Sequence, residues 1–195
     1  MTTKVHYRPW VGKNYENGKL YGKRIMILGE SHYGKELGEV NDTTSQVIEE
    51  AEFQHLYTTR FLRMVPPAVM GYSSSDSLTH EQRKEFWDSV LFYNYIQESV
   101  NGGPRGSRTN KQWSDAAEPF LEVINQYKPE IILVFGVGIG NNITRKNAVN
   151  KDIKGLKAVE YTLNEGIKSI AVAVRHPAGG MSYKEVHNVV DKILK

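Results

Sequence analysis

Four short apolar runs, separated by segments of helical periodicity, constrain the fold of this chain more than any other feature. They are Ile25–Leu28, Val90–Asn94, Ile131–Phe135 and Ile167–Val174. Continuous apolar strands that alternate with amphipathic helices are typical of a parallel sheet covered on both faces. We therefore predict an α/β fold with three layers, α/β/α, around a mostly parallel sheet of four to five strands. The length of 195 residues suits a single domain, residues 1–195.

The segments between these runs carry helix signals. Residues 45–64 have the apolar spacing of one amphipathic helix, which Pro66 and Pro67 are expected to end. Residues of cap-forming type mark where further helices begin: Thr79, Ser114, and the capping box of Ser182 and Glu185.

The composition excludes several classes of function. The chain has no cysteine, so disulfides, thiolate zinc sites, cysteine-ligated iron–sulfur clusters and a cysteine nucleophile are ruled out. Residues 1–10 lack the apolar core of a signal peptide, and no stretch reaches the ~18 apolar residues of a membrane span. We expect a cytoplasmic protein that has no membrane contact.

Two polar loops directly follow the first and the last apolar run. The first is Gly29–Gly34 (Gly-Glu-Ser-His-Tyr-Gly), and the second is Arg175–Gly180 (Arg-His-Pro-Ala-Gly-Gly). Ligand sites in open α/β sheets form beyond the carboxyl ends of the strands, so these loops are expected to face one pocket. Asn94, at the end of a third run, would bring an amide to the same edge.

The first loop is compatible with a serine hydrolase. The Gly29–Ser31 turn after a strand resembles the Gly-Asp-Ser turn of the SGNH hydrolases, in which the serine needs a histidine oriented by a carboxylate. His176 is the candidate base. The aspartate expected shortly before that histidine is absent, because Ala173 and Val174 occupy the positions.

Cationic residues gather locally, although the net charge is only +3. Residues 101–111 contain Arg105, Arg108 and Lys111 together with three glycines and no acidic residue. Flexible basic loops with free backbone amides suit phosphate contacts. We predict that these three side chains contact the phosphates of a nucleic acid.

In chain order, the loops resemble the motifs of the uracil-DNA glycosylase superfamily. Its members have an early strand that ends in a Gly-[Gln/Glu/Met/Ile]-x-Pro-[Tyr/Gly] loop, a middle strand that ends in a base-reading Asn, and a late strand that ends in His-Pro-[Ser/Ala]. The matching segments here are Gly29–Tyr33, Asn94 and His176–Ala178. The resemblance covers the chain from about Tyr21 onward. It implies the fold of that superfamily and a monofunctional DNA glycosylase, which excises a base with water and leaves an abasic site. Such an enzyme is expected to act as a monomer and to need no metal or organic cofactor.

The resemblance also implies roles for individual residues. Asn94 would read the edge of an extruded base, Gly29 would let the base approach the backbone, and His176 would stabilise the leaving base anion. Phe53, Tyr57 or Phe61 would stack on the base, and Met181 would be an apolar wedge inserted into the base stack.

The first loop departs from the family pattern at its centre. Uracil enzymes have an Asp two residues after the glycine to position water, and this chain has Ser31 there. We predict that Glu30 replaces it, with His32 as the second candidate. Tyr33 matches the residue that blocks C5 substituents in strict uracil enzymes.

The substrate and the catalytic competence stay open at this point. The resemblance implies single- or double-stranded DNA that carries uracil or a modified pyrimidine. The hypermodified cytosines of phage DNA are included, since anti-phage glycosylases of this superfamily are known. Both repair and antiviral defence fit. A non-catalytic nucleic-acid-binding module is a further alternative, because Ser31 vacates the position that activates water.

Overall fold

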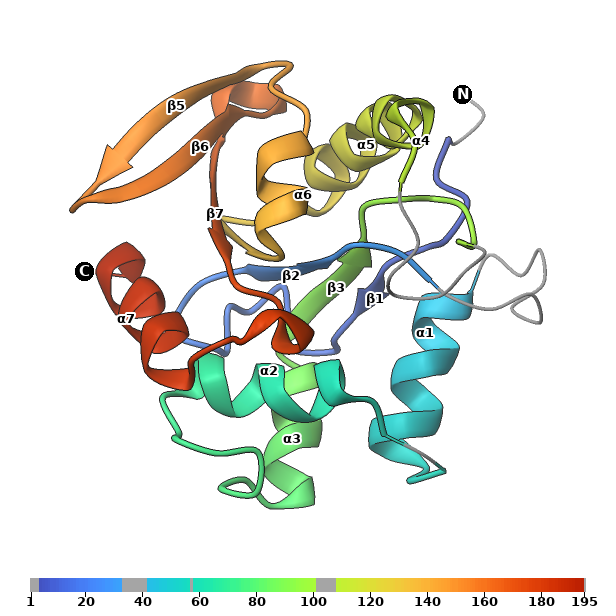
Figure 1. The fold of residues 1–195 in the computed structure, drawn as a ribbon, viewed down its shortest axis with the longest axis vertical. Coiled ribbons are helices and arrows are strands. Elements are labelled where there is room, and N and C mark those ends of the chain that lie inside the picture. The colour runs from blue at the N-terminus through green and yellow to red at the C-terminus, as the bar shows by residue number, and fades with distance from the viewer. Residues whose placement is uncertain (1–3, 33–41, 57, 101–107, 195) are drawn as a thin grey trace.

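A computed structural model describes residues 4–32, 42–56, 58–100 and 108–194 (Figure 1). Within these residues a seven-stranded sheet has the order β1-β3-β2-β4-β7-β6-β5. The strands are β1 (Trp10–Val11), β2 (Ile25–Gly29), β3 (Val90–Asn94), β4 (Ile131–Phe135), β5 (Ala148–Ile153), β6 (Leu156–Thr162) and β7 (Lys168–Val174).

The sheet is mixed. Strands β3, β2, β4 and β7 are parallel to one another. Strand β1 pairs antiparallel with β3, and β6 pairs antiparallel with both β5 and β7. The predicted α/β class is confirmed, whereas the prediction of a mostly parallel sheet of four to five strands is wrong. The missed strand β5 is half-exposed or exposed along its whole length, so its sequence lacks the apolar run by which the buried strands were recognised.

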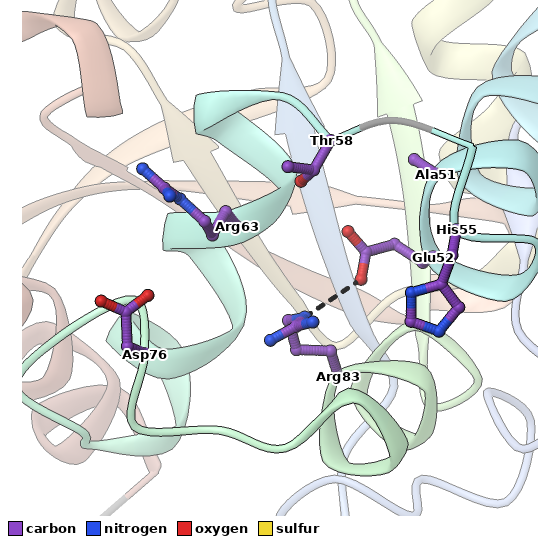
Figure 2. Close-up of a pocket in the computed structure, with 7 residues that line it drawn as sticks. All are labelled: Ala51, Glu52, His55, Thr58, Arg63, Asp76 and Arg83. Atoms are coloured by element: carbon purple, nitrogen blue, oxygen red, sulfur yellow. Dashed lines mark ion pairs between the residues drawn. The ribbon is translucent and has the colours of Figure 1, made fainter.

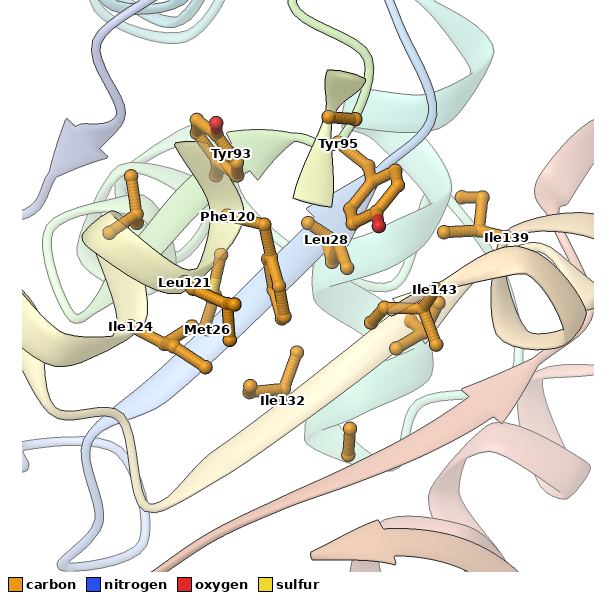
Figure 3. Packing of buried hydrophobic residues seen from close by; sticks show 14 of the residues in the cluster. Met26, Leu28, Tyr93, Tyr95, Phe120, Leu121, Ile124, Ile132, Ile139 and Ile143 are labelled. Atoms are coloured by element: carbon orange, nitrogen blue, oxygen red, sulfur yellow. The ribbon is translucent and has the colours of Figure 1, made fainter. Parts of the chain in front are cut away.

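Helices pack on both faces of this sheet (Figure 1). Side chains alternate along β2, so Met26 and Leu28 belong to one hydrophobic cluster and Ile25 and Ile27 to the other. Figure 3 shows the first cluster, in which Phe120 lies among strand side chains. That face carries α5 (Ala117–Tyr127) and α6 (Val137–Asn142). The opposite face carries α1 (Thr43–Ile48), α2 (Arg60–Met70), α3 (His80–Trp87) and α7 (Tyr183–Leu194).

The predicted helix over residues 45–64 is instead divided. Helix α1 continues into a π-helical turn, η1 (Glu49–Phe53), and α2 begins separately at Arg60. Pro66 and Pro67 do not end a helix, because both lie inside α2 with buried rings. Each proline removes one backbone hydrogen bond, and the burial of both rings in the core offsets that cost. Helix α2 ends where Gly71 adopts a left-handed conformation, with φ at 85°.

The predicted helix starts are confirmed at two of three positions. Thr79 caps α3, and Ser182 accepts a hydrogen bond from the backbone of the first turn of α7. The prediction for Ser114 is wrong, because this residue lies inside the short helix α4 (Asn110–Asp115). Thr109 caps α4 in a capping box with Gln112. In the described part of the chain, no helix combines the length and the apolar character needed to span a membrane.

Candidate active site

The parallel strands bring the predicted loops to one edge of the sheet. Strand β2 has β3, which follows it in sequence, on one side and β4 on the other. Such a reversal of strand order produces a crevice at the carboxyl ends, where open α/β sheets bind ligands. Residues 29–32 leave β2 at this edge, Asn94 ends β3, and His176 follows β7.

Gly29 and Asn94 form the floor of this crevice. They are opposite each other in the register of β2 and β3. The Asn94 side chain covers the Gly29 backbone so closely that a Cβ atom at position 29 would collide with Asn94 Oδ1. A Cβ atom at position 29 would also lie 3.3 Å from Phe92 Cε2. Glycine at position 29 is therefore required for the amide to rest on the strand.

His32 is buried beside Asn94 and orients its amide. Its Nε2 lies 2.9 Å from Thr44 Oγ1, and Asn94 Nδ2 lies 3.2 Å from the same ring nitrogen. The Tyr7 ring packs against the imidazole edge-on, with ring centroids 4.8 Å apart. Burial lowers the pKa of His32 to about 4, so the ring is neutral at pH 7 and has one nitrogen that accepts a hydrogen bond.

Arg108 holds the first loop through Glu30 and Ser31. Its Nη2 lies 2.6 Å from Glu30 Oε1 and donates to Ser31 Oγ at 3.2 Å. The Arg108 side chain is only 3% exposed, against 26% for Glu30. We predicted that this guanidinium contacts phosphates. In the structure it is enclosed within the site, where it is bound to the first loop.

The other two predicted phosphate contacts have different positions. Lys111 is exposed and forms an ion pair with Asp115 one turn along α4. Arg105 lies outside the described residues, as do Tyr33 and the stacking candidate Tyr57.

Among the described residues, the hydrogen-bond partner of Ser31 Oγ is an arginine and not a histidine. Arginine stays protonated in proteins, so Arg108 cannot accept a proton from the serine hydroxyl. Among the described residues, no histidine is hydrogen-bonded to Ser31 Oγ. The serine hydrolase alternative therefore lacks the nucleophile–base pair on which it depends.

His176 is held in one tautomer at the opposite side of the crevice. Its Nδ1 accepts a hydrogen bond of 3.0 Å from the Ala178 backbone N–H, so the neutral ring carries its proton on Nε2. Burial, and secondly the charge of Arg60, lowers the pKa of His176. At neutral pH this residue thus offers one N–H donor without a positive charge.

Phe61 connects His176 to the floor of the crevice. This half-buried ring on α2 has its centroid 5.6 Å from that of His176 and 5.5 Å from that of Phe92. Since Phe92 is the neighbour of Gly29 described above, one continuous set of contacts runs from Asn94 through Gly29 and Phe92 to Phe61 and His176.

Two predicted DNA-contacting residues lie apart from this set. Phe53 packs against Trp10, with ring centroids 5.4 Å apart, and its face contacts Lys84 Nζ at 5.1 Å. Met181 is 8% exposed and belongs to the core cluster beneath α2 and α7. This position does not favour a Met181 wedge, since a side chain enclosed in the core does not project toward a base stack.

Sequence reasoning missed Thr44, Arg60 and the positioning role of Arg108. None of them follows an apolar strand, which was the signal used to find the site. Arg60 is the first residue of α2, directly after the Thr59 cap. Because it is adjacent in sequence to Phe61, a predicted stacking residue, it could have been recognised as a candidate for the site. Thr44 had no comparable signal.

Neither a metal site nor a known relative assigns the function. The part of the chain that the structure describes has no group of three or more His, Cys, Asp or Glu side chains placed to hold a metal ion. No protein-family model and no curated protein matches the sequence. The function has to be inferred from the arrangement of the residues in the crevice.

Proposed function

We propose that this protein is a DNA glycosylase related to the uracil-DNA glycosylases. It would extrude a base from DNA, hydrolyse the bond between base and sugar, and leave an abasic site. The observation that carries the proposal is the continuous set of contacts from Asn94 over Gly29 and Phe92 to Phe61 and His176. It places an amide, an aromatic face and an imidazole donor around one crevice, and a flipped base requires groups of these kinds.

Asn94 supplies the recognition of the base edge. A carboxamide has two N–H donors and one acceptor oxygen, and one donor is directed at His32. One N–H donor and the acceptor oxygen of Asn94 remain. This pair is complementary to an acceptor and a donor that are adjacent on the edge of a pyrimidine. Because the neutral His32 accepts from the amide, it fixes which end of Asn94 meets the base.

His176 and Phe61 act on the departing base. As the bond to the sugar breaks, its electron pair passes to the base and negative charge develops on the base oxygens. The Nε2–H of His176 would donate to one of these oxygens, which stabilises the leaving anion. Phe61 would stack on the base, and such contacts are worth about 1–3 kcal/mol per base.

Glu30 is the group proposed to act on water. Its carboxylate, held by Arg108 at 2.6 Å, would accept a hydrogen bond from the water that attacks the sugar C1′. The negative charge would also offset the positive charge that develops on the sugar. The proton of the attacking water passes to this carboxylate and from there to solvent or to the released base.

The proposal extends to the fold and the partner. Helices on both faces of the sheet and the reversal of strand order at β2 support a three-layer arrangement like that of the superfamily. DNA is the proposed partner, the chain would act as a monomer in the cytoplasm, and the biological role would be repair or defence against phage.

The test is excision from a panel of DNA substrates. Duplexes and single strands with uracil, hypoxanthine or modified cytosines, together with phage genomic DNA, are incubated with the protein, and abasic sites are then cleaved with alkali. We expect cleavage at one class of modified base. Asn94→Ala and His176→Ala should each lower the rate by about 100-fold or more, the scale of losing one preorganised donor. Lys151→Ala, on the exposed strand β5, is the matched control and should leave the rate unchanged.

Other outcomes identify the alternatives. DNA binding without cleavage of any substrate would contradict the glycosylase and favour a binding module. Covalent labelling of Ser31 by a fluorophosphonate would favour the hydrolase.

A further inference from the structure

A second concavity is lined by none of the residues proposed for excision. It lies between η1, α2 and α3 and has a volume of about 380 Å³ (Figure 2). Its lining residues are Ala51, Glu52, His55, Thr58, Arg63, Asp76 and Arg83. This volume is in the range of small-molecule sites, and six of these seven side chains are polar or charged.

The pocket is lined by one buried carboxylate, that of Glu52, which can accept more hydrogen bonds than it receives. The Glu52 side chain is 2% exposed, and its Oε2 lies 3.5 Å from Arg83 Nε. Among the described residues, Arg83 is the one ion-pair partner of this carboxylate. A carboxylate can accept about four hydrogen bonds, so a single contact of this length leaves most of that capacity unused. Burial accordingly raises the pKa of Glu52, although Arg83 acts in the opposite direction.

The two arginines of the pocket differ in depth. Arg83 belongs to α3, its side chain is 23% exposed, and its Nη1 donates to the Leu78 carbonyl at 3.1 Å. Among the described residues, the hydrogen-bond and ion-pair partners of this guanidinium are the Leu78 carbonyl and Glu52. Arg63 belongs to α2, is exposed, and has no ion-pair partner in the described part of the chain. The pocket therefore has an acceptor and a donor side by side, Glu52 and Arg83, and a second cation, Arg63, among its lining residues.

We propose that this pocket binds guanine as part of a guanine nucleotide. The two oxygens of Glu52 accept from N1–H and N2–H of the base, Arg83 donates to O6, and Arg63 contacts the phosphate. Carboxylates accept such paired N–H donors in a bidentate manner, and arginine is the usual partner of guanine O6 and of phosphate.

The order of groups on the base edge distinguishes guanine from the other bases. Guanine presents one acceptor followed by two donors, which matches an arginine next to a carboxylate. Cytosine and adenine present a ring nitrogen acceptor beside the amino group, and this lone pair would face the carboxylate. Thymine and uracil present a single N–H between two carbonyl oxygens. Only guanine gives each oxygen of Glu52 a donor.

The guanine can come from two sources that share this chemistry. It can belong to a free nucleotide, or to the DNA strand that the proposed excision site would bind. The nucleotide pocket does not depend on excision activity, since it is argued from Glu52, Arg83 and Arg63 alone.

The test is binding of mononucleotides to the full chain by isothermal titration calorimetry. The critical comparison is dGMP with dIMP, because hypoxanthine keeps O6 and N1–H and lacks only the 2-amino group. We expect dGMP to bind about tenfold more tightly than dIMP, the ratio that one hydrogen bond to a charged group provides. Equal affinities, or no saturable binding of dGMP, would overturn the proposal without the need for any variant.

Variants assign the contacts. Glu52→Gln should reduce the ratio between dGMP and dIMP to about one, whereas Glu50→Gln on the same helical turn, outside the pocket, should preserve it. Arg63→Ala should weaken dGMP but leave guanosine, which has no phosphate, unchanged. A folded Glu52→Gln protein that still prefers dGMP would contradict the assignment.

Single-stranded oligonucleotides then separate the two sources. Replacement of guanine by hypoxanthine should weaken binding of the strand if the pocket reads guanine in DNA. An unchanged affinity of the strand, together with the preference for dGMP, identifies a free nucleotide as the ligand. Failure of excision in the substrate panel would leave all of these binding results intact, so the two proposals fail separately.

Discussion

Acid should destabilise this protein through His32, by an amount that its burial determines. The ring is 5% exposed, and burial lowers its pKa from 6.5 to about 4. The unfolded chain therefore binds a proton between pH 6.5 and pH 4, whereas the folded protein does not. Where the unfolded state binds more protons, the free energy of unfolding rises with pH. Stability is thus complete above pH 6.5 and is lost as the pH falls toward 4.

The size of this loss follows from the shift. A displacement from 6.5 to about 4 corresponds at pH 4 to about 3 kcal/mol of unfolding free energy. That is a large part of the stability of an ordinary domain, about 5–15 kcal/mol. His176, whose pKa is also lowered by burial and by Arg60, acts in the same direction, so the contribution of His32 has to be measured as a difference between two proteins.

The assay is urea unfolding of the wild type and of His32→Gln at pH 7, 6, 5 and 4. Glutamine can keep hydrogen bonds to Thr44 and Asn94 without a titrating group. The wild type should lose about 3 kcal/mol relative to the variant between pH 7 and pH 4, and NMR titration of the ring should show that His32 stays neutral to below pH 5. A difference between the two proteins that does not change with pH would refute a buried neutral His32.

Three further substitutions test the remaining contacts. Gly29→Ala should displace Asn94 and cost about 1–3 kcal/mol of stability by overpacking, with a larger loss in excision rate. Thermal melting measures the stability and the alkali-cleavage assay measures the rate. A variant that keeps its excision activity would show that Gly29 is not part of the site. Met181→Ala should destabilise by about 2–5 kcal/mol in urea as a core truncation while DNA affinity stays the same, whereas a wedge would show the reverse. Phe61→Ala should weaken binding to DNA that carries the target base by about 1–3 kcal/mol in an anisotropy titration, with no change for the same DNA that lacks this base; equal weakening of both would exclude stacking.

The buried strands could be predicted from the sequence because both of their faces are covered. All five residues of β4, Ile131–Phe135, are buried, so a continuous apolar run marks its limits. Strand β5 could not be predicted in this way. Its side chains point to solvent on either side, and its pairing with β6 supplies the order that its own composition does not indicate.

The helix over residues 45–64 failed as a prediction for a different reason. Its apolar periodicity is real, since Ile48 and Leu62 both reach the same core cluster. Periodicity reports which face is buried, but not whether the backbone between two turns stays helical. His55 takes a left-handed conformation with φ at 59°, and this break separates η1 from α2. His55, at this break, is one of the residues that line the pocket containing Glu52.

The site was predictable where it depends on strand ends and unpredictable where it depends on side chains from distant segments. Gly29, Asn94 and His176 each lie at or just after the end of a strand, and the rule for parallel sheets brings such ends together. Arg108 is 78 residues from Glu30 in sequence, and its contact is formed only by the folded chain. Local composition therefore indicated a cationic loop residue, while the fold makes it the partner of the first loop.

The residues at which the first loop differs from the glycosylase motif that it resembles are connected by shared contacts. Ser31 accepts a hydrogen bond from Arg108, the residue that also binds the Glu30 carboxylate. An aspartate at position 31 would compete with Glu30 for that guanidinium, so the serine and the glutamate are mutually dependent. His32 bonds to neither of them but to Thr44 and Asn94. The carboxylate of the loop thus contacts Arg108, whereas its imidazole contacts Asn94. The proposed activation of water and the proposed reading of the base therefore depend on separate contacts.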